Sequence, residues 1–184
     1  MGTRGRRPSP APSAELRFVR REDRRVQIYV HRPDGSETTW TTSSFGTGLP
    51  HDLVHLVVER ALGVRRGLWG LVCAGVDIAR VNAMANRRGG PDKWSMLGDD
   101  IRELLWAEAL ANQPWRGEPF DDAAIEASLR GAAASLGEVA TVPDAAARRR
   151  LREELVALHG QWSGLPPKVA LVQAFPAPTV APRG

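Results

Sequence analysis

Two of the four histidines in this 184-residue chain lie four positions apart, in the string His51-Asp52-Leu53-Val54-His55. In a helix this spacing places both imidazoles on one side, a single turn apart. Paired histidines at this distance are typical of helical metal-binding motifs, because two neighbouring imidazoles can ligate one ion. The spacing therefore indicates a site for a divalent metal ion, with His51 and His55 as two of its ligands.

The surrounding pattern predicts a helix over residues 50–62. Around that helix, His51 and His55 border the arc of aliphatic side chains, and Asp52 and Glu59 lie just beyond them. A half-buried site forms at such an edge, whereas a purely solvent-facing pair would lie opposite the aliphatic arc. We therefore expect the histidines to lie where the protein core meets the surface.

Glu59 follows His51 by a rise of about 12 Å along the helix, which is too far for both side chains to bind one ion. We interpret Glu59 as the partner that orients His55 through its second ring nitrogen. A third ligand must come from another element, and Asp77 is favoured because it follows an apolar segment and opens a helix. The other candidates are Glu103, Glu108, His159 and Cys73.

The five residues from His51 to His55 resemble the zincin motif His-Glu-x-x-His, with an aspartate in place of the glutamate. In zincins both histidines bind zinc, and the carboxylate between them handles the metal-bound water. The resemblance implies a metal-dependent hydrolase that holds zinc, with Asp52 as its general base. Aspartate is one methylene shorter than glutamate, which limits its reach toward that water.

A longer stretch, from Leu49 to Gly75, resembles a group of uncharacterised actinobacterial proteins. The shared pattern is Pro-His-Asp-Leu-x-His-x-x-Val-Glu, followed by Gly-x-Trp-Gly. The resemblance implies a shared fold and a shared core site, and it implies no particular reaction. Trp69 in the second part of the pattern is expected in the core, where its flanking glycines allow close approach to the helix.

Two other interpretations of the histidine pair remain open. In the first, the histidines are structural and form hydrogen bonds to Asp52, Glu59 or loop carbonyls. In the second, the chemistry is metal-free: His55 is the base, and Ser43 or Ser44 from the preceding loop is the nucleophile. No Gly-x-Ser-x-Gly motif accompanies these serines.

The elements that must position this helix come first in the chain. Residues 15–21, 25–32 and 37–43 are rich in β-branched and aromatic side chains that alternate with polar ones. Residues 33–36, Pro-Asp-Gly-Ser, favour a tight turn between the last two segments. We predict a small three-stranded antiparallel meander with one buried face, packed on the helix 50–62.

The rest of the chain is predicted to be mostly helical, which together with the preceding strands indicates the α+β class. Asp121 is expected to cap one of the later helices, and Gly160 is expected to end the last of them. The apolar residues 169–175 suit either a strand that returns to the sheet or a strapping loop. The longer helices are expected over residues 98–113, 121–136 and 143–159.

Residues 1–13 and 175–184 are rich in proline and have no periodic apolar pattern, so we expect disordered tails around a single domain of residues 14–174. No apolar run approaches the roughly 18–20 residues of a membrane helix, and no apolar secretory segment follows the N-terminus. We therefore expect a cytoplasmic protein with no membrane partner. The one cysteine, Cys73, excludes an internal disulfide and a multi-cysteine metal site.

The chain is basic, with a net charge of +4 and a pI near 10.1, and all but two of its 25 basic residues are arginines. The densest cluster covers the N-terminal tail and the first hairpin, where nucleic acid or an acidic partner could bind. Acidic residues dilute that cluster, and no aromatic platform or helix-turn-helix pattern accompanies it. The run of residues 148–150 is expected to form a solvated helix face. The sequence does not identify the substrate of a metal enzyme. The alternative function is a non-catalytic interaction or nucleic-acid-binding protein with structural histidines.

Overall fold

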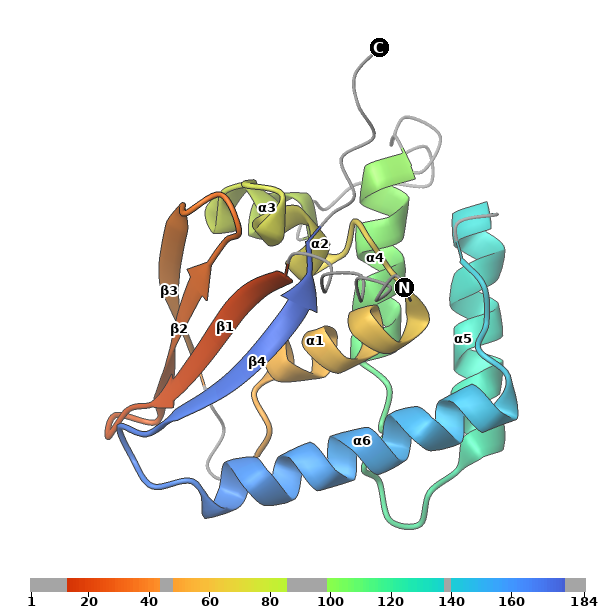
Figure 1. Ribbon diagram of the computed structural model, residues 1–184. Helices are drawn as coiled ribbons and strands as arrows, with labels where there is room; N and C mark the ends of the chain where they lie inside the picture. The colour runs from red at the N-terminus through yellow and green to blue at the C-terminus, as the bar shows by residue number, and fades with distance from the viewer. Residues whose placement is uncertain (1–12, 44–47, 86–98, 138–139, 178–184) are drawn as a thin grey trace, which may run out of the picture.

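The described part of the chain forms a four-stranded sheet and six helices (Figure 1). The structure is a computed structural model that describes residues 13–43, 48–85, 99–137 and 140–177. The strands are β1 (Ser13–Arg20), β2 (Arg25–His31), β3 (Glu37–Ser43) and β4 (Ala170–Pro176). The helices are α1 (His51–Leu62), α2 (Leu68–Cys73), α3 (Ile78–Ala85), α4 (Asp99–Ala111), α5 (Asp122–Leu136) and α6 (Ala145–Gly164). Three strands precede the helices, which confirms the α+β class.

The sheet has the order β3-β2-β1-β4, and every neighbouring pair is antiparallel. Side chains alternate between its two faces, so that Phe18 of β1 and Ile28 of β2, which lie opposite each other, are both fully buried. This confirms the predicted meander. The sheet has a fourth strand beyond the predicted three, because β4 pairs with the other edge of β1 and places Leu171 opposite Phe18; of the two alternatives for residues 169–175, the strand that returns to the sheet is confirmed. That edge of β1 has backbone groups that need partners, and β4 supplies them.

Helix α1 lies against the apolar face of the sheet, with α4 and α6 packed around it (Figure 1). None of the described helices covers the other face of the sheet, called the open face below, and Tyr29 and Val172 on that side are 41% and 50% exposed. Because α1 also contacts α2 and β4, it is enclosed from several directions, and every residue from Leu53 to Glu59 is buried. The enclosure therefore takes His55 and Glu59 into the core together with the aliphatic residues.

The later helices agree in part with the predicted boundaries. Asp121 caps α5 as predicted, and its carboxylate accepts a hydrogen bond of 2.9 Å from the backbone N–H of Ala124. The prediction that Gly160 ends α6 is wrong, since the helix continues to Gly164. The fully buried Trp162 packs the last turn of α6 into the core, and this contact outweighs the low helix propensity of the glycine.

The two ends of the described chain are strands. β1 begins at Ser13 and β4 ends at Pro176, so both extend slightly beyond the predicted domain of residues 14–174. The remaining parts of the two predicted tails, residues 1–12 and 178–184, lie outside the described residues. Within the described ranges, no helix combines the length and the apolar character needed to cross a membrane.

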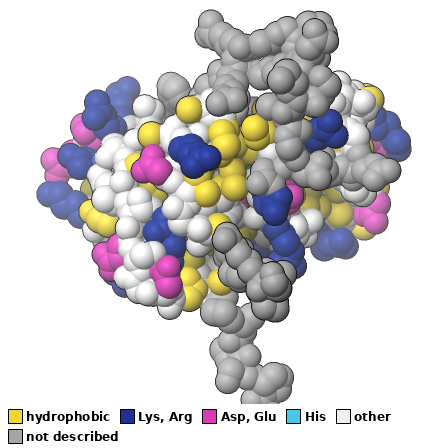
Figure 2. Space-filling view, turned by 90° about the horizontal axis from the view of Figure 1, so that it is seen from above, with side chains coloured by type: hydrophobic (Ala, Val, Ile, Leu, Met, Phe, Trp, Pro, Cys, Tyr) yellow, Lys and Arg dark blue, Asp and Glu magenta, His cyan; other side chains and the backbone are white. Residues whose placement is uncertain are grey.

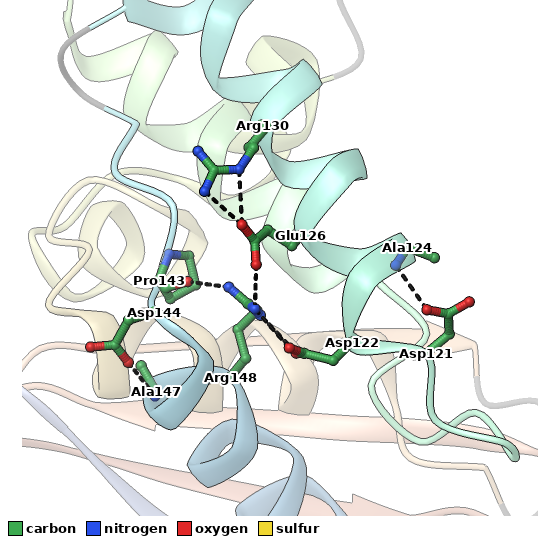
Figure 3. A network of polar contacts seen from close by, with 9 residues as sticks. All are labelled: Asp121, Asp122, Ala124, Glu126, Arg130, Pro143, Asp144, Ala147 and Arg148. Atoms are coloured by element: carbon green, nitrogen blue, oxygen red, sulfur yellow. Dashed lines mark hydrogen bonds and ion pairs between the residues drawn. The ribbon is translucent and has the colours of Figure 1, made fainter.

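A buried arginine joins the start of α6 to α5 (Figure 3). The side chain of Arg148 is 3% exposed, which corrects the prediction that its whole run forms a solvated face. Its guanidinium donates two hydrogen bonds of 2.7 Å to Asp122 and one of 2.5 Å to Glu126. A fourth hydrogen bond, of 2.7 Å, goes to the backbone carbonyl of Pro143. The carboxylates lie four residues apart on one side of α5, so a single cation can bind both.

Replacing Arg148 by methionine is expected to lower Tm at neutral pH by about 5 °C, because two carboxylates lose their common cation. Hydrogen bonding to Arg148 holds the pKa of Asp122 below its ordinary 3.8, and Arg130 together with Arg148 holds the pKa of Glu126 below its ordinary 4.5. The stabilisation is therefore present above those ordinary values and is lost as the pH falls through the lowered ones. The difference between variant and wild type should shrink below about pH 4.

Thermal unfolding followed by circular dichroism at neutral pH and at about pH 3 measures this difference. Arg150→Met is the matched control, because Arg150 is exposed on the same helix. The control should leave Tm unchanged, and an equal decrease in both variants would contradict the role of the Arg148 network.

Candidate metal centre

Helix α1 carries both histidines and begins at His51, within one residue of the predicted start. Pro50 precedes it with φ −55° and ψ 142°, and Gly63 ends it with φ 69°. Glycine adopts this left-handed conformation without strain, so Gly63 stops the helix as its position in the sequence predicts. The side chain of His51 is 47% exposed and that of His55 is 1% exposed. The histidine pair therefore runs from the surface into the core.

Glu108 on α4 forms a three-residue group with the two histidines. Its Oε2 lies 3.6 Å from Nε2 of His51, and its Oε1 lies 3.4 Å from Nε2 of His55. The ligand atoms of the three residues all lie within 4.8 Å of one another, so the group could hold a metal ion. In the described ranges, this is the one group of three or more His, Cys, Asp or Glu side chains with that property.

Two of the separations within this group are short enough for a shared ion, although they involve different oxygens of Glu108. Zinc binds imidazole nitrogen and carboxylate oxygen at about 2.0–2.2 Å, which places neighbouring ligand atoms about 3.3 Å apart. The contacts of Glu108 with the two histidines, at 3.4 and 3.6 Å, are close to that separation. The imidazole rings of His51 and His55 lie edge to face, with centroids 4.8 Å apart. Because His51 is partly exposed, its ring has room to adjust to an ion.

His55 is held from its other side by Glu59, one helical turn further along α1. Oε1 of Glu59 lies 3.1 Å from Nδ1 of His55. The second oxygen of Glu59 accepts hydrogen bonds from the backbone N–H groups of Trp69, at 2.9 Å, and Gly70, at 3.3 Å. The carboxylate of Glu59, which is fully buried, therefore links the imidazole of α1 to the backbone of α2. This contact with His55 is the one that the sequence spacing predicts.

Charge and burial act against each other in this cluster. Burial lowers the pKa of His55, but the carboxylates of Glu108 and Glu59 outweigh it and raise that pKa to about 9. Burial raises the pKa of Glu108, yet the two imidazoles outweigh it and hold this pKa well below its ordinary value. Burial raises the pKa of Glu59. Without an ion the group is therefore a network of imidazolium and carboxylate, and a metal must displace a proton from His55.

The Gly-x-Trp-Gly segment shapes the pocket that receives Glu59. A Cβ atom at Gly67 would overlap the carboxylate of Glu59, and one at Gly70 would overlap the backbone carbonyl of Arg65. Trp69 is fully buried, and its ring packs against Phe18 with centroids 5.6 Å apart. This confirms Trp69 as a core residue and the glycines as points of close approach.

Asp52 lies beside the group but is not one of its three members. Its Oδ2 accepts a hydrogen bond of 3.1 Å from Nε1 of Trp40, and Nε1 of Trp69 donates one of 2.8 Å to its backbone carbonyl. Burial raises the pKa of the Asp52 carboxyl, and the hydrogen bond from Trp40 opposes the rise. The indole of Trp40 thus holds the Asp52 carboxyl close to the charges of the three-residue group.

Asp77, the third ligand that the sequence favours, has a different place in the structure. Its Oδ1 accepts a hydrogen bond of 2.8 Å from the backbone N–H of Ala79 at the start of α3, and it is not part of the three-residue group. Glu108 instead lies four residues after Leu104 and three before Ala111, both of which are buried. It therefore borders the apolar stripe of its helix, as the histidines do on α1, and this position makes it a candidate without distinguishing it from the other acidic residues.

The other candidate ligands also lie outside the group. Glu103 accepts a hydrogen bond of 3.0 Å from the backbone N–H of Arg66. Cys73 is buried in α2, and burial raises the pKa of its thiol to about 12, so it is not a reactive thiolate. His159 on α6 lies 3.3 Å from the hydroxyl of Ser163. Ser44, named as a possible nucleophile, lies outside the described residues.

The arginines of the first hairpin lie close to acidic residues rather than forming a purely basic surface. Arg17 pairs with Glu15 at 2.7 Å, and Arg21 and Arg25 lie 3.6 and 3.8 Å from Asp23. On the face shown in Figure 2, Lys and Arg side chains are interspersed with Asp and Glu. These contacts do not favour a nucleic-acid interface on the described part of the chain.

Comparisons with models of known protein families, with curated proteins and with solved structures found no match to this chain. The two resemblances stated from the sequence therefore stay predictions.

Proposed function

We propose that this protein binds a divalent metal ion, zinc, through His51, His55 and Glu108, and uses it for hydrolysis. The observation that carries the proposal concerns Nε2 of His55, which is buried and has no hydrogen-bond partner among the described residues. Glu108 lies 3.4 Å from this atom without the geometry of a hydrogen bond. Nε2 of His55 thus faces the Glu108 carboxylate at ion-pair distance but lacks the hydrogen bond that a buried nitrogen normally has, and an ion between the two side chains would bind both.

The contact on the other side of the imidazole supports the same role. We assign the proton on Nδ1 of His55 to its hydrogen bond with Glu59, which leaves the lone pair of Nε2 for an ion. Carboxylate–histidine contacts of this kind orient the imidazole in metal sites and make it a stronger ligand. Glu59 is thereby a positioning residue for His55.

Three protein ligands leave one position of a tetrahedral ion open, as in catalytic zinc sites and unlike structural ones. Two histidines and a glutamate are one of the ligand sets that catalytic zinc sites use. His51 lines a cavity of about 690 Å³, which provides access for a substrate. A zinc ion held here would lower the pKa of a bound water to about 7, and we assign to Asp52 the role of general base.

The experiment is a measurement of bound metal in protein purified without a metal-affinity tag. After incubation with zinc and dialysis, mass spectrometry of the metals should give about one zinc ion per wild-type chain. His51→Ala removes an exposed ligand at little cost to the core, so it should bind much less zinc and remain folded. His55→Gln should do the same, with circular dichroism as the check on folding.

His31→Ala is the matched control, because His31 lies on the open face of the sheet and pairs with Glu37 at 2.7 Å. The control should retain full zinc content. A wild-type chain that stays free of metal after addition of zinc, iron, nickel and manganese would contradict the proposal.

A further inference from the structure

The cavity beside His51 has the size of a small-molecule site, about 690 Å³. Its walls come from the start of α1, from the segment that follows α4, and from α6. Leu49, Val54 and Leu155 supply apolar surface to it. His51 belongs both to this wall and to the candidate metal centre, whereas His55 and Glu108 do not line the cavity, so His51 is the residue that joins the two.

Arg116 brings a positive charge to the cavity. It is exposed, and its guanidinium forms no ion pair or hydrogen bond with any residue that the structure describes. Arg148 and Arg60 in the helical layer are paired, at 2.7 Å from Asp122 and 2.5 Å from Glu154, whereas the exposed Arg80 and Arg150, like Arg116, have no side-chain partner among the described residues. An arginine without an acidic partner at a cavity suits a ligand with a carboxylate, which its planar guanidinium can bind through two hydrogen bonds.

Two amides in the same wall add hydrogen-bond acceptors. Nδ2 of Asn112 donates a hydrogen bond of 2.9 Å to the carbonyl of Glu108, and Nε2 of Gln113 donates one of 2.7 Å to the carbonyl of Ala109. Because α4 binds these nitrogens, the side-chain oxygens of Asn112 and Gln113 are the atoms left to accept hydrogen bonds. A ligand with an amide N–H close to its carboxylate matches them.

Building on the proposed metal centre, we propose that this cavity binds the substrate and that the substrate is a small N-acyl amino acid. Its carboxylate pairs with Arg116, its amide N–H lies near Asn112 or Gln113, and its acyl group packs on the apolar wall. Hydrolysis of this class breaks the acyl C–N bond. The hydroxyl of water joins the acyl carbon and the remaining proton joins the nitrogen, which yields a carboxylic acid and a free amino acid.

Calorimetric titration of the zinc-loaded full chain with N-benzoylglycine tests the proposal. Wild type should bind it, and Arg116→Gln should bind it about tenfold more weakly or worse, because a charge-assisted contact is lost. Arg116→Lys should retain part of the affinity. Arg80→Gln, at an exposed position of α3, is the matched control and should bind like wild type.

Two related probes identify the anion. N-benzoylglycinamide lacks the carboxylate and should bind at least tenfold more weakly than N-benzoylglycine. Benzyl phosphate should also bind more weakly, and tighter binding of this probe would overturn the carboxylate assignment. Binding of N-benzoylglycine that is absent at millimolar concentration, or unchanged in Arg116→Gln, would overturn the proposal itself.

Titration of metal-free Glu108→Gln protein with N-benzoylglycine distinguishes a failure of the carboxylate site from a failure of the metal centre. If the wild-type chain binds no zinc but the affinity for N-benzoylglycine still depends on Arg116, the metal centre fails and the carboxylate site stands. If zinc binds and substitution of Arg116 has no effect, the carboxylate site fails and the metal centre stands. Release of glycine and benzoate by the zinc-loaded wild type then tests the reaction.

Discussion

Replacing Glu108 by glutamine is expected to weaken zinc binding about 100-fold or more, since even residues that only contact ligands change metal affinity by about 10- to 100-fold. The amide keeps the size of the side chain but removes the negative charge that faces His51 and His55 at 3.6 and 3.4 Å. A neutral amide oxygen is a poorer ligand for zinc than a carboxylate. The variant should therefore fold but hold the ion only weakly.

Competition with a chromophoric zinc chelator measures the two affinities. Glu103→Gln is the matched control, because Glu103 lies on the same helix and contacts the backbone of Arg66 instead of the histidines. Combining Glu108→Gln with His51→Ala should cost less than the sum of the single effects, since both remove ligands of one ion. Equal zinc affinity in Glu108→Gln and wild type would show that Glu108 is not a ligand.

Replacing Gly70 by alanine is expected to destabilise the protein by about 3 kcal/mol and to lower Tm by about 6–12 °C. The added Cβ would lie under 3.0 Å from the backbone carbonyl of Arg65, and neither backbone can move without disturbing its neighbours. The N–H of Gly70 also donates to the carboxylate of Glu59, which in turn contacts His55. A shift of this backbone should thus weaken zinc binding as well.

Gly131→Ala is the matched control for the same chemical change. Gly131 lies inside α5, and a Cβ atom there meets nothing within 4 Å. Alanine favours the helix more than glycine does, so this variant should be more stable by about 0.5–1 kcal/mol. Thermal unfolding of the two variants and the wild type gives the comparison. Wild-type stability of Gly70→Ala would contradict the close packing of α2 against the Arg65 backbone.

Local patterns in the sequence predict a large part of this fold. The meander and α1 follow from side-chain periods of two and of about 3.6, which depend on residues within one or two turns. The contact between His55 and Glu59 is predictable for the same reason, because both residues lie on one helix and are separated by one turn. The end of α1 at Gly63 is likewise a local property of glycine.

Other features depend on elements that are distant in the sequence. Gly160 has a low helix propensity, yet α6 passes through it because Trp162 is buried in the core. Arg148 is buried although charged neighbours suggest an exposed face, because α5 presents two carboxylates to it. In each case a tertiary contact outweighs the local preference, which for the helix propensity of Gly160 is only about 1 kcal/mol.

In the candidate site, too, some features follow from local sequence and others depend on tertiary packing. The spacing of His51 and His55 was sufficient to place two imidazoles at the edge of a buried helix, because that geometry is repeated in every α-helix. The third member of the group could not be chosen from the sequence, since several acidic side chains had suitable local patterns. Packing of α4 against α1 brings Glu108 to the histidines and leaves Asp77 at the start of α3. Such packing depends on how whole faces of helices fit together, which no short stretch of sequence contains.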